Sequence, residues 1–362
     1  MKPSDRHGLC SSPNFRGGVY GITAATLFGV SSPLSKLLLP EAGALLIAGL
    51  LYLGAGLGLR AFELLFYRRS VASQRESLVG PSDRWLLAGI VLTGGILGPV
   101  CMLWGLRRLS AVLGALLLNL EAPFTIGLAV LLFREHLGRR EMAGVLLIVG
   151  AAAILQFRPE EMRPDPWGFL AIVGACLWWA IDNNLSQRVS LRDPIVVTRI
   201  KTLGAAICTL SMAFLSGQSS PRPVILVATL LVGLFSYGVS LVLDMQALRL
   251  LGAAREAGFF AIAPFVGAMA AVPILGERWG INEVCASLVM AMGVVLLFRE
   301  HHHHVHVHEE IEHDHVHAHG GHHEHEHEGR LAEEPHAHLH RHVPLMHDHP
   351  HVSELHHRHE HE

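Results

Sequence analysis

Charged residues are scarce in this chain, and their scarcity excludes most soluble folds. Only 16% of the 362 residues are charged, whereas 51% are hydrophobic and the mean hydropathy is +0.37. Soluble domains carry about 25% charged residues. The composition therefore predicts an integral membrane protein rather than a soluble two-domain chain.

Cysteine is also sparse, and familiar catalytic motifs are absent from the sequence. The five cysteines stand singly, so neither a disulfide framework nor a thiolate metal site is expected. Residues 1–16 are polar and carry basic side chains, so they lack the apolar core of a cleavable signal peptide and are expected to form a cytoplasmic N-terminal segment. We find no nucleophile–base constellation, no phosphate-binding glycine loop and no H-E-x-x-H motif. We therefore expect no enzyme activity and no required cofactor.

Long apolar runs fill residues 17–298. A helix that crosses a bilayer needs about 20 mostly apolar residues. Six runs meet this need without any Asp, Glu, Lys or Arg, and four more qualify with one or a few charges; Pro194 is expected to open the seventh helix. These runs predict an all-α integral membrane protein with ten transmembrane helices. The charge-free runs are 17–35, 42–59, 85–106, 202–221, 223–243 and 257–276, and the others are 109–133, 142–157, 167–187 and 284–298.

The distribution of lysine and arginine predicts the orientation, because these residues are enriched in cytoplasmic connections. With the N-terminus inside, the inside connections hold 16 of them and the outside connections hold 7, when the two within the seventh helix and the three distal tail arginines are left out. We therefore expect a multi-pass protein of the cell inner membrane with both termini in the cytoplasm.

An internal repeat is visible when the chain is aligned with itself. The stretch LEAPF at 120–124, followed by FRE at 133–135, recurs as AIAPF at 261–265, followed by LGE at 275–277. Likewise, FGVSSPLSK at 28–36 resembles WAIDNNLSQ at 179–187. Each half holds five predicted helices, an odd number, so the second half is inverted in the membrane. Inverted repeats around a midplane site are typical of secondary transporters.

Segments 116–155 and 259–298 resemble the paired EamA repeats of the drug/metabolite transporter superfamily. In that family a helix carries a central proline and ends in a Gly/Arg-Glu step before a polar turn. The resemblance covers about residues 17–298 and implies an inner-membrane carrier built from two inverted five-helix repeats, 17–158 and 167–298, around a central cavity. One departure is the Phe133-Arg134-Glu135 step of the first half, which implies a local change at that helix end.

Ionisable residues inside the membrane are costly, so each is a functional candidate. Glu121 stands near the middle of the fourth helix, two residues before Pro123, and Pro264 occupies the equivalent place in the second half. Both prolines are expected to kink their helices, which frees backbone groups. The counterpart of Glu121 is Ile262, so this carboxylate is no general feature of the repeat. Glu121 is predicted to contact substrate or carry a proton; the alternative is a buried salt bridge.

A second polar group interrupts the sixth and seventh helices. Asp182, Asn183 and Asn184 lie in the sixth, and Arg199 and Lys201 lie in the seventh. Because a short turn joins these helices, Asp182 can pair with Lys201 or Arg199 across the hairpin, which would neutralise both charges. Alternatively, the two cations hold a substrate carboxylate or phosphate while the asparagines supply neutral hydrogen bonds. Both interpretations stay open here.

The C-terminal residues 299–362 differ sharply from the rest of the chain. They hold 25 of the 27 histidines and carry a net charge of −10, against +7 for residues 1–298. Such a segment has too few apolar residues for a core, so it is predicted to be a disordered cytoplasmic tail. Its negative charge disfavours nucleic-acid binding.

Imidazoles interleaved with carboxylates favour zinc, nickel, cobalt or copper. The tail is therefore predicted to bind divalent metal ions. A pH-responsive polyelectrolyte and a segment without function are the alternatives. The candidate ligands are His301, His302, His303, His304, His306, His308, His313, His315, His317, His319, His322, His323, His325 and His327.

Three functions are weighed for the whole chain. The favoured one is a secondary carrier that exports a small polar, amino-acid-like metabolite and has a metal-binding tail. The first alternative is a divalent-metal transporter whose tail loads or senses the ion. The spanning region contains few metal ligands for such a path, because His136 is its one histidine and stands at a helix end. The second is a membrane-anchored metal-binding protein without transport. The expected partners are the lipid bilayer, a small-molecule substrate and metal ions, with the oligomeric state left open and a homodimer as one option.

Overall fold

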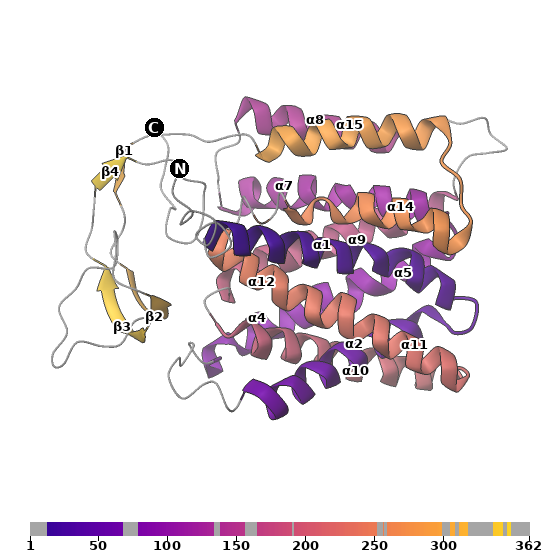
Figure 1. Cartoon of the computed structure of the whole chain (residues 1–362), viewed down its shortest axis with the longest axis horizontal. Helices are drawn as coiled ribbons and strands as arrows, with labels where there is room; N and C mark the ends of the chain where they lie inside the picture. The colour runs from indigo at the N-terminus through magenta and orange to yellow at the C-terminus, as the bar shows by residue number, and fades with distance from the viewer. Residues whose placement is uncertain are drawn as a thin grey trace, which may run out of the picture.

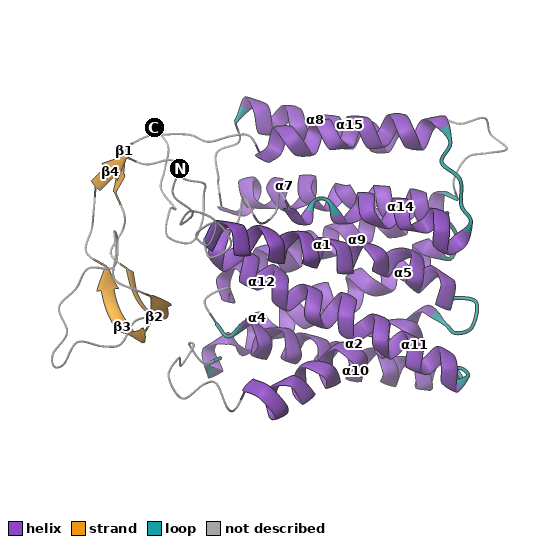
Figure 2. Cartoon of the chain, viewed as in Figure 1, coloured by secondary structure: helices purple, strands orange, loops and turns teal. Residues whose placement is uncertain are grey.

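The protein is described by a computed structural model. It covers residues 13–67, 79–133, 138–155, 165–189, 192–251, 256 and 259–298, and in the C-terminal part residues 305–307, 311–317, 336–342 and 346–348. From residue 13 to residue 298 these described segments are helices joined by turns (Figure 2).

The first half of the chain forms five helical stretches, several of them with a change of helix type inside. They are α1 (Pro13–Leu38); α2 (Ala44–Phe62) with the π-helical η1 (Glu63–Tyr67); the 3₁₀ turn η2 (Pro81–Asp83) with α4 (Arg84–Ile90), the π-helical η3 (Val91–Leu97) and α5 (Gly98–Leu106); α6 (Ala111–Leu117) with the 3₁₀ turn η4 (Leu118–Leu120) and α7 (Glu121–Phe133); and α8 (Arg139–Ile154).

The second half follows the same order. Its elements are α9 (Pro166–Ser186) with the 3₁₀ turn η6 (Gln187–Val189); α10 (Pro194–Leu215); α11 (Pro223–Gly233) with the π-helical η7 (Leu234–Val239) and α12 (Ser240–Leu251); α14 (Ala263–Leu275); and α15 (Ile281–Phe298). A π-helical segment therefore stands inside the third stretch of each half.

Local chemistry sets several helix ends. The Asp193 carboxylate accepts hydrogen bonds from the backbone N–H groups of Ile195 (2.8 Å) and Val196 (3.3 Å), and Pro194 opens α10 as expected. Helix α14 ends at Gly276, which adopts a left-handed conformation (φ 68°) that residues with a side chain disfavour.

The helices of the two halves interleave. Helix α1 packs against α12 and α14, and α9 packs against α5 and α7. Helices α2 and α10 pack together in the body, while α8 and α15 lie side by side at one edge of the bundle (Figure 1). Each half thus supplies a first helix that packs between the third and fourth stretches of the other.

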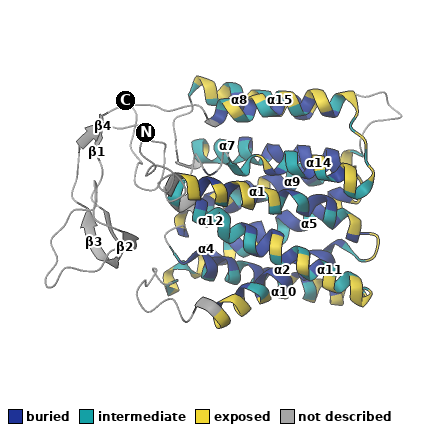
Figure 3. Ribbon diagram, in the orientation of Figure 1, coloured by how far each residue is buried: buried dark blue, intermediate teal, exposed yellow. Residues whose placement is uncertain are grey.

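The outer surface is apolar, as lipid contact requires. Large side chains such as Leu131, Leu215 and Ile281 are more than three-quarters exposed, and exposed positions line the outer helices (Figure 3). Among the described residues, six helical stretches are long and apolar enough to cross a membrane, and two shorter apolar helices accompany them. These lengths support several membrane spans, and the number of ten stays a prediction. The six are Ala44–Leu65, Pro81–Leu106, Ala111–Leu131, Pro166–Ser186, Pro194–Leu215 and Pro223–Ala247, and the shorter two are Ala263–Leu275 and Ile281–Leu297.

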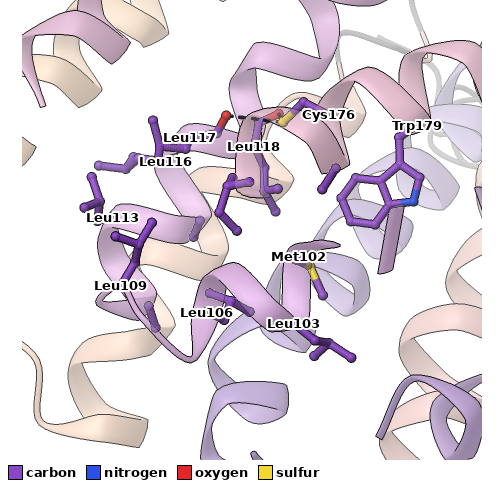
Figure 4. Packing of buried hydrophobic residues seen from close by; sticks show 14 of the residues in the cluster. Met102, Leu103, Leu106, Leu109, Leu113, Leu116, Leu117, Leu118, Cys176 and Trp179 are labelled. Carbon is purple, nitrogen blue, oxygen red and sulfur yellow. Dashed lines mark hydrogen bonds between the residues drawn. The ribbon is translucent and has the colours of Figure 1, made fainter. Parts of the chain in front are cut away.

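The interior is filled mainly by leucine, alanine and aromatic side chains. In the close-up of Figure 4, Met102, Leu103 and Leu106 lie near one another in the buried cluster. Cys176 of α9 donates from its thiol to the carbonyl groups of Leu117 and Leu118. This contact holds α9 against the fourth helical stretch, within the turn that precedes Glu121.

One expectation about the helices needs correction. The run 257–276 is broken by a turn at residues 261–262, so Pro264 lies in the first turn of α14 and does not kink a continuous helix. The reason is physical: proline lacks an N–H group and its fixed φ suits the first turn of a helix.

Four short segments of the tail form strands, and the rest of the predicted disordered tail lies outside the described residues. The strands β1 (Val305–Val307) and β4 (Met346–Asp348) pair antiparallel, as do β2 (Ile311–His317) and β3 (His336–His342). Histidine alternates there with Val, Ala, Leu and charged residues, and a period of two suits a strand. The register sets His313, His315 and His317 opposite other histidines.

Glycine permits the closest helix approach in the bundle. Gly54 of α2 lies against the backbone of Leu230 in α11, and Gly233 of α11 lies against the backbone of Leu51 in α2. A Cβ atom at either glycine would collide with a backbone carbonyl group, which cannot move away as a side chain can. Small residues at such crossings are typical of membrane helix packing.

We predict that Gly54→Ala lowers the melting temperature of the purified protein, because the added methyl group forces α2 and α11 apart. Gly174→Ala on α9 is the matched control: nothing lies within 4 Å of that position, and alanine favours a helix over glycine by about 1 kcal/mol. Thermal unfolding in detergent measures both variants. Equal melting temperatures for the two would contradict the close-approach argument.

Candidate functional site

Polar side chains meet where α7 packs against α9. The Asn183 side chain donates from Nδ2 to Glu121 Oε1 (2.7 Å), and Thr125 Oγ1 lies 3.5 Å from the same nitrogen. Asn184 donates to the carbonyl groups of Ala180 (2.8 Å) and Thr125 (3.3 Å). Asn184 is buried, whereas Asn183 is exposed and Glu121 half-buried. The Glu121–Asn183 pair is therefore the reachable part of this group.

The local fold explains the position of Glu121. The 3₁₀ turn η4 precedes it, α7 begins at Glu121 itself, and Pro123 is buried in the first turn of α7. The change of helix type and the missing N–H group of proline break the regular ladder of backbone hydrogen bonds. Glu121 is therefore presented at a break in the fourth helical stretch.

Asp182 and Lys201 form the ion pair that the sequence offered as one interpretation. Lys201 Nζ lies 2.5 Å from Asp182 Oδ2, and the Asp182 side chain is almost fully buried. Asp182 packs directly on Gly94 of η3, where a Cβ atom would overlap its carboxylate. Its second oxygen, Oδ1, is buried and has no hydrogen-bond partner. The pair thus joins α9, α10 and η3.

The π-helical segment η3 supplies an acceptor to the same region. The Gly94 carbonyl accepts from Tyr52 Oη (2.9 Å) and from Trp179 Nε1 (3.3 Å). In a π-helix the backbone hydrogen-bond ladder is shifted, which leaves carbonyl groups open to side chains. Phe28 packs edge-on against Trp179, with ring centroids 6.0 Å apart, and against Tyr237, 5.6 Å apart. A buried aromatic cluster therefore stands beside the Asp182–Lys201 pair.

Arg199 does not join this group. It forms an ion pair with Glu63 at the end of α2, and Arg60 lies 3.0 Å from the same carboxylate. Glu63 is buried, so removal of either partner would leave an uncompensated charge between α2 and α10. Sequence analysis did not name Glu63, which follows the charge-free run 42–59.

A second ion pair lies at the C-terminal end of α1. Lys36 Nζ is 3.3 Å from Glu277 Oε1, and the Glu277 carboxylate accepts from the backbone N–H groups of Ala111 (2.7 Å) and Val112 (2.9 Å). Glu277 thus caps the first turn of α6 from the second half of the chain. The Gly276-Glu277 step of the repeat pointed to Glu277 in the sequence, but it did not reveal that Glu277 binds Lys36 and the start of α6.

No group of three or more His, Cys, Asp or Glu side chains that could hold a metal ion occurs among the described residues. Of the predicted tail ligands, His306, His313, His315 and His317 lie in described strands. The other ten lie outside the described residues: His301, His302, His303, His304, His308, His319, His322, His323, His325 and His327.

Apolar helices with an exposed apolar surface, and charged groups held between them, define a multi-span membrane protein. Comparison with known families identifies it further. The EamA-like transporter family matches residues 15–157 and again residues 166–299, and the chain belongs to this family.

Individual relatives agree with this membership. The chain is 29% identical over 289 residues to an uncharacterized transporter of Methanothermobacter thermautotrophicus, covering 76% of this chain and 84% of that one. It is 26% identical over 182 residues to a probable amino-acid metabolite efflux pump of Salmonella typhimurium, covering 49% and 56%. A solved crystal structure, 18% identical, superposes with a TM-score of 0.59 over 78% of this chain and 98% of that one. That likeness shows the fold alone.

We predict that Asp182→Asn lowers the free energy of unfolding by about 3–5 kcal/mol, because Lys201 is left charged and buried. Adding Lys201→Met to this variant should recover part of the loss, since the unpaired charge is gone. A double-mutant cycle of denaturation in detergent measures the coupling. As a control, Glu41→Gln breaks the exposed pair with Arg222 and should cost about 1 kcal/mol or less. Independent, additive effects of the two interior changes would contradict the pairing.

Proposed function

We propose that this transporter exports a small polar, amino-acid-like metabolite across the cell inner membrane, and that Glu121 with Asn183 forms its substrate contact. The observation that carries the proposal is the Glu121–Asn183 pair within an apolar helical bundle, in which Asn183 is exposed and Glu121 half-buried. A carboxylate facing lipid is costly, so an accessible one marks a water-filled path or a ligand site. The name of the Salmonella relative supports the substrate class.

The chemistry of the pair suits a zwitterion. The Glu121 carboxylate can accept hydrogen bonds from a substrate ammonium group, and the Asn183 amide can donate to a substrate carboxylate. Lys201 is bound to Asp182, so it is a weaker candidate for an anion than the sequence suggested. Glu121 or Asp182 is the proposed proton carrier for energy coupling.

The proposed architecture has ten transmembrane helices in two inverted repeats, 17–158 and 167–298, with both termini in the cytoplasm. Two observations support it. The first helix of each half packs against the third and fourth stretches of the other half. A π-helical segment, η3 or η7, interrupts the third stretch in both halves. Related halves of opposite orientation would produce both features.

Metal binding is proposed for the tail, with zinc, nickel, cobalt or copper as the ion. The ligand density of the sequence supports this, because imidazole is a good ligand for all four ions. The strand register adds support, since the three histidines of β2 at 313, 315 and 317 stand opposite histidines of β3. The metal is proposed as a bound or sensed ion and not as the cargo.

We predict that Glu121→Gln lowers amino-acid efflux about tenfold or more, because it removes a charge-assisted contact worth about 1.5–3 kcal/mol. Membrane insertion and melting temperature should stay near those of the parent. Efflux of radiolabelled amino acids from proteoliposomes measures the effect, with Glu41→Gln as the control that removes an exterior carboxylate. A Glu121→Gln variant that fails to fold, or one that transports normally, would count against a substrate contact.

We predict that a chain cut after Arg299 loses most nickel, cobalt and zinc binding yet retains amino-acid efflux. The tail holds 25 of the 27 histidines, so few imidazole ligands remain after the cut. Isothermal titration measures binding, and everted vesicles measure metal movement. Metal that crosses the membrane in the truncated chain would make the ion the cargo and contradict the metabolite proposal.

A further inference from the structure

Three serines share one face of α1, away from the polar groups described above. Ser31, Ser32 and Ser35 fall within about 100° of the helix surface, because an α-helix has 3.6 residues per turn. All three are buried, with 2% or less of their surface exposed. Ser31 Oγ lies 3.5 Å from Tyr237 Oη. The hydroxyl groups of Ser32 and Ser35 have no hydrogen-bond partner in the part of the chain that the structure describes.

Other buried hydroxyl groups of the bundle bond to their own helix. Those of Thr202, Thr209 and Thr229 donate to the carbonyl group four residues earlier, at 2.8, 2.7 and 2.7 Å. A serine within a helix can form the same bond, whereas Ser32 and Ser35 do not. Because a buried polar group without a partner is costly, these two hydroxyl groups mark a place that a polar ligand can complete.

The serine face is the repeat counterpart of the polar group in α9. In the aligned repeat, Ser31 stands opposite Asp182. Their contacts correspond as well: Asp182 packs on Gly94, the fourth residue of η3, and Ser31 contacts Tyr237, the fourth residue of η7. Each half therefore sets a polar residue of its first helix against the π-helical segment of the other half.

An aromatic contact lies between the two polar groups. Phe28 and Trp179 are counterparts in the repeat, and their ring centroids are 6.0 Å apart. A contact between equivalent residues lies on the axis that relates the halves. Ser32 follows Phe28 by four residues, and Asn183 follows Trp179 by four. In the proposed inverted arrangement the two helices run in opposite directions, so the serine face lies on the outer side of the aromatic contact and Asn183 on the cytoplasmic side.

We propose that Ser32 and Ser35 form a second polar site on the transport path, which binds the carboxylate of the exported metabolite after it leaves the Glu121–Asn183 contact. This inference rests on the proposed function and on the proposed orientation. Both hydroxyl groups can donate to a carboxylate, and neither has to leave another partner first. The metabolite reaches them when the aromatic rings between the two sites move apart.

Binding is tested by transport kinetics measured from each face of the membrane. The double variant Ser32→Ala with Ser35→Ala removes hydroxyl groups that lack a partner, so its melting temperature should not fall below that of the parent. In proteoliposomes of known orientation, its KM for radiolabelled amino acids should rise about tenfold at the outer face and less than about twofold at the cytoplasmic face, since each hydrogen bond contributes modestly.

The matched control is Ser287→Ala on α15, whose hydroxyl group bonds to the carbonyl group of Val284 in its own helix. Its KM should equal that of the parent at both faces. An unchanged KM of the double variant at the outer face would overturn the proposal, as would an equal rise at both faces.

Access to the site is tested by thiol labelling, which does not require a known substrate. Ser32→Cys should react with a charged methanethiosulfonate reagent added at the outer face, and amino acids should slow the reaction. The parent chain, with its five cysteines, gives the background. No reaction above this background would overturn the site. If the parent moves no amino acid at all, the proposed function fails and the carboxylate ligand with it, while the labelling still decides whether the serine face lines a water-filled path.

Discussion

The buried ion pair between Asp182 and Lys201 is the contact on which the polar interior depends. A low-dielectric bundle tolerates a charge only when a partner is fixed beside it. Asp182 reaches its partner because Gly94 leaves room for the carboxylate, and the Gly94 carbonyl in turn receives Tyr52 and Trp179. Gly94 of the π-helical segment η3 thus has two roles. Its missing side chain leaves room for the Asp182 carboxylate, and its carbonyl group accepts hydrogen bonds from Tyr52 and Trp179. Four helical stretches meet at this point.

The charged contacts outside the interior divide between the two ends of the bundle. Glu63 with Arg199 ties α2 to α10 at one end, and Lys36 with Glu277 ties the end of α1 to the turn after α14 at the other. Each tie joins a helix of the first half to an element of the second. A motion of one half against the other must therefore break or stretch at least one of these contacts.

The sequence predicted the helices well where composition alone decides. Charge-free runs of about 20 residues have few alternatives to a spanning helix, and Asp182 with Lys201 was within reach because a short turn joins their helices. The contacts of Glu63 with Arg199 and of Lys36 with Glu277 depend on packing between distant segments, which no local pattern reveals. Pro264 was misassigned because its pattern also fits the start of a helix. The four strands of the tail follow an alternation of residues, to which the sequence analysis gave less weight than to the histidine composition.

The partners of the buried carboxyl groups explain why Glu121 is the one proposed as the substrate contact. Asp182 is paired with Lys201, and Glu63 is paired with Arg199, so each of these two already has a fixed cationic partner. Glu121 is held only by neutral donors from Asn183, and it is half-buried where Asp182 and Glu63 are buried. A neutral amide gives up its place at a carboxylate more easily than a cation does, because no buried charge is left behind. Glu121 is therefore the acidic site that a substrate can enter without breaking a charge pair.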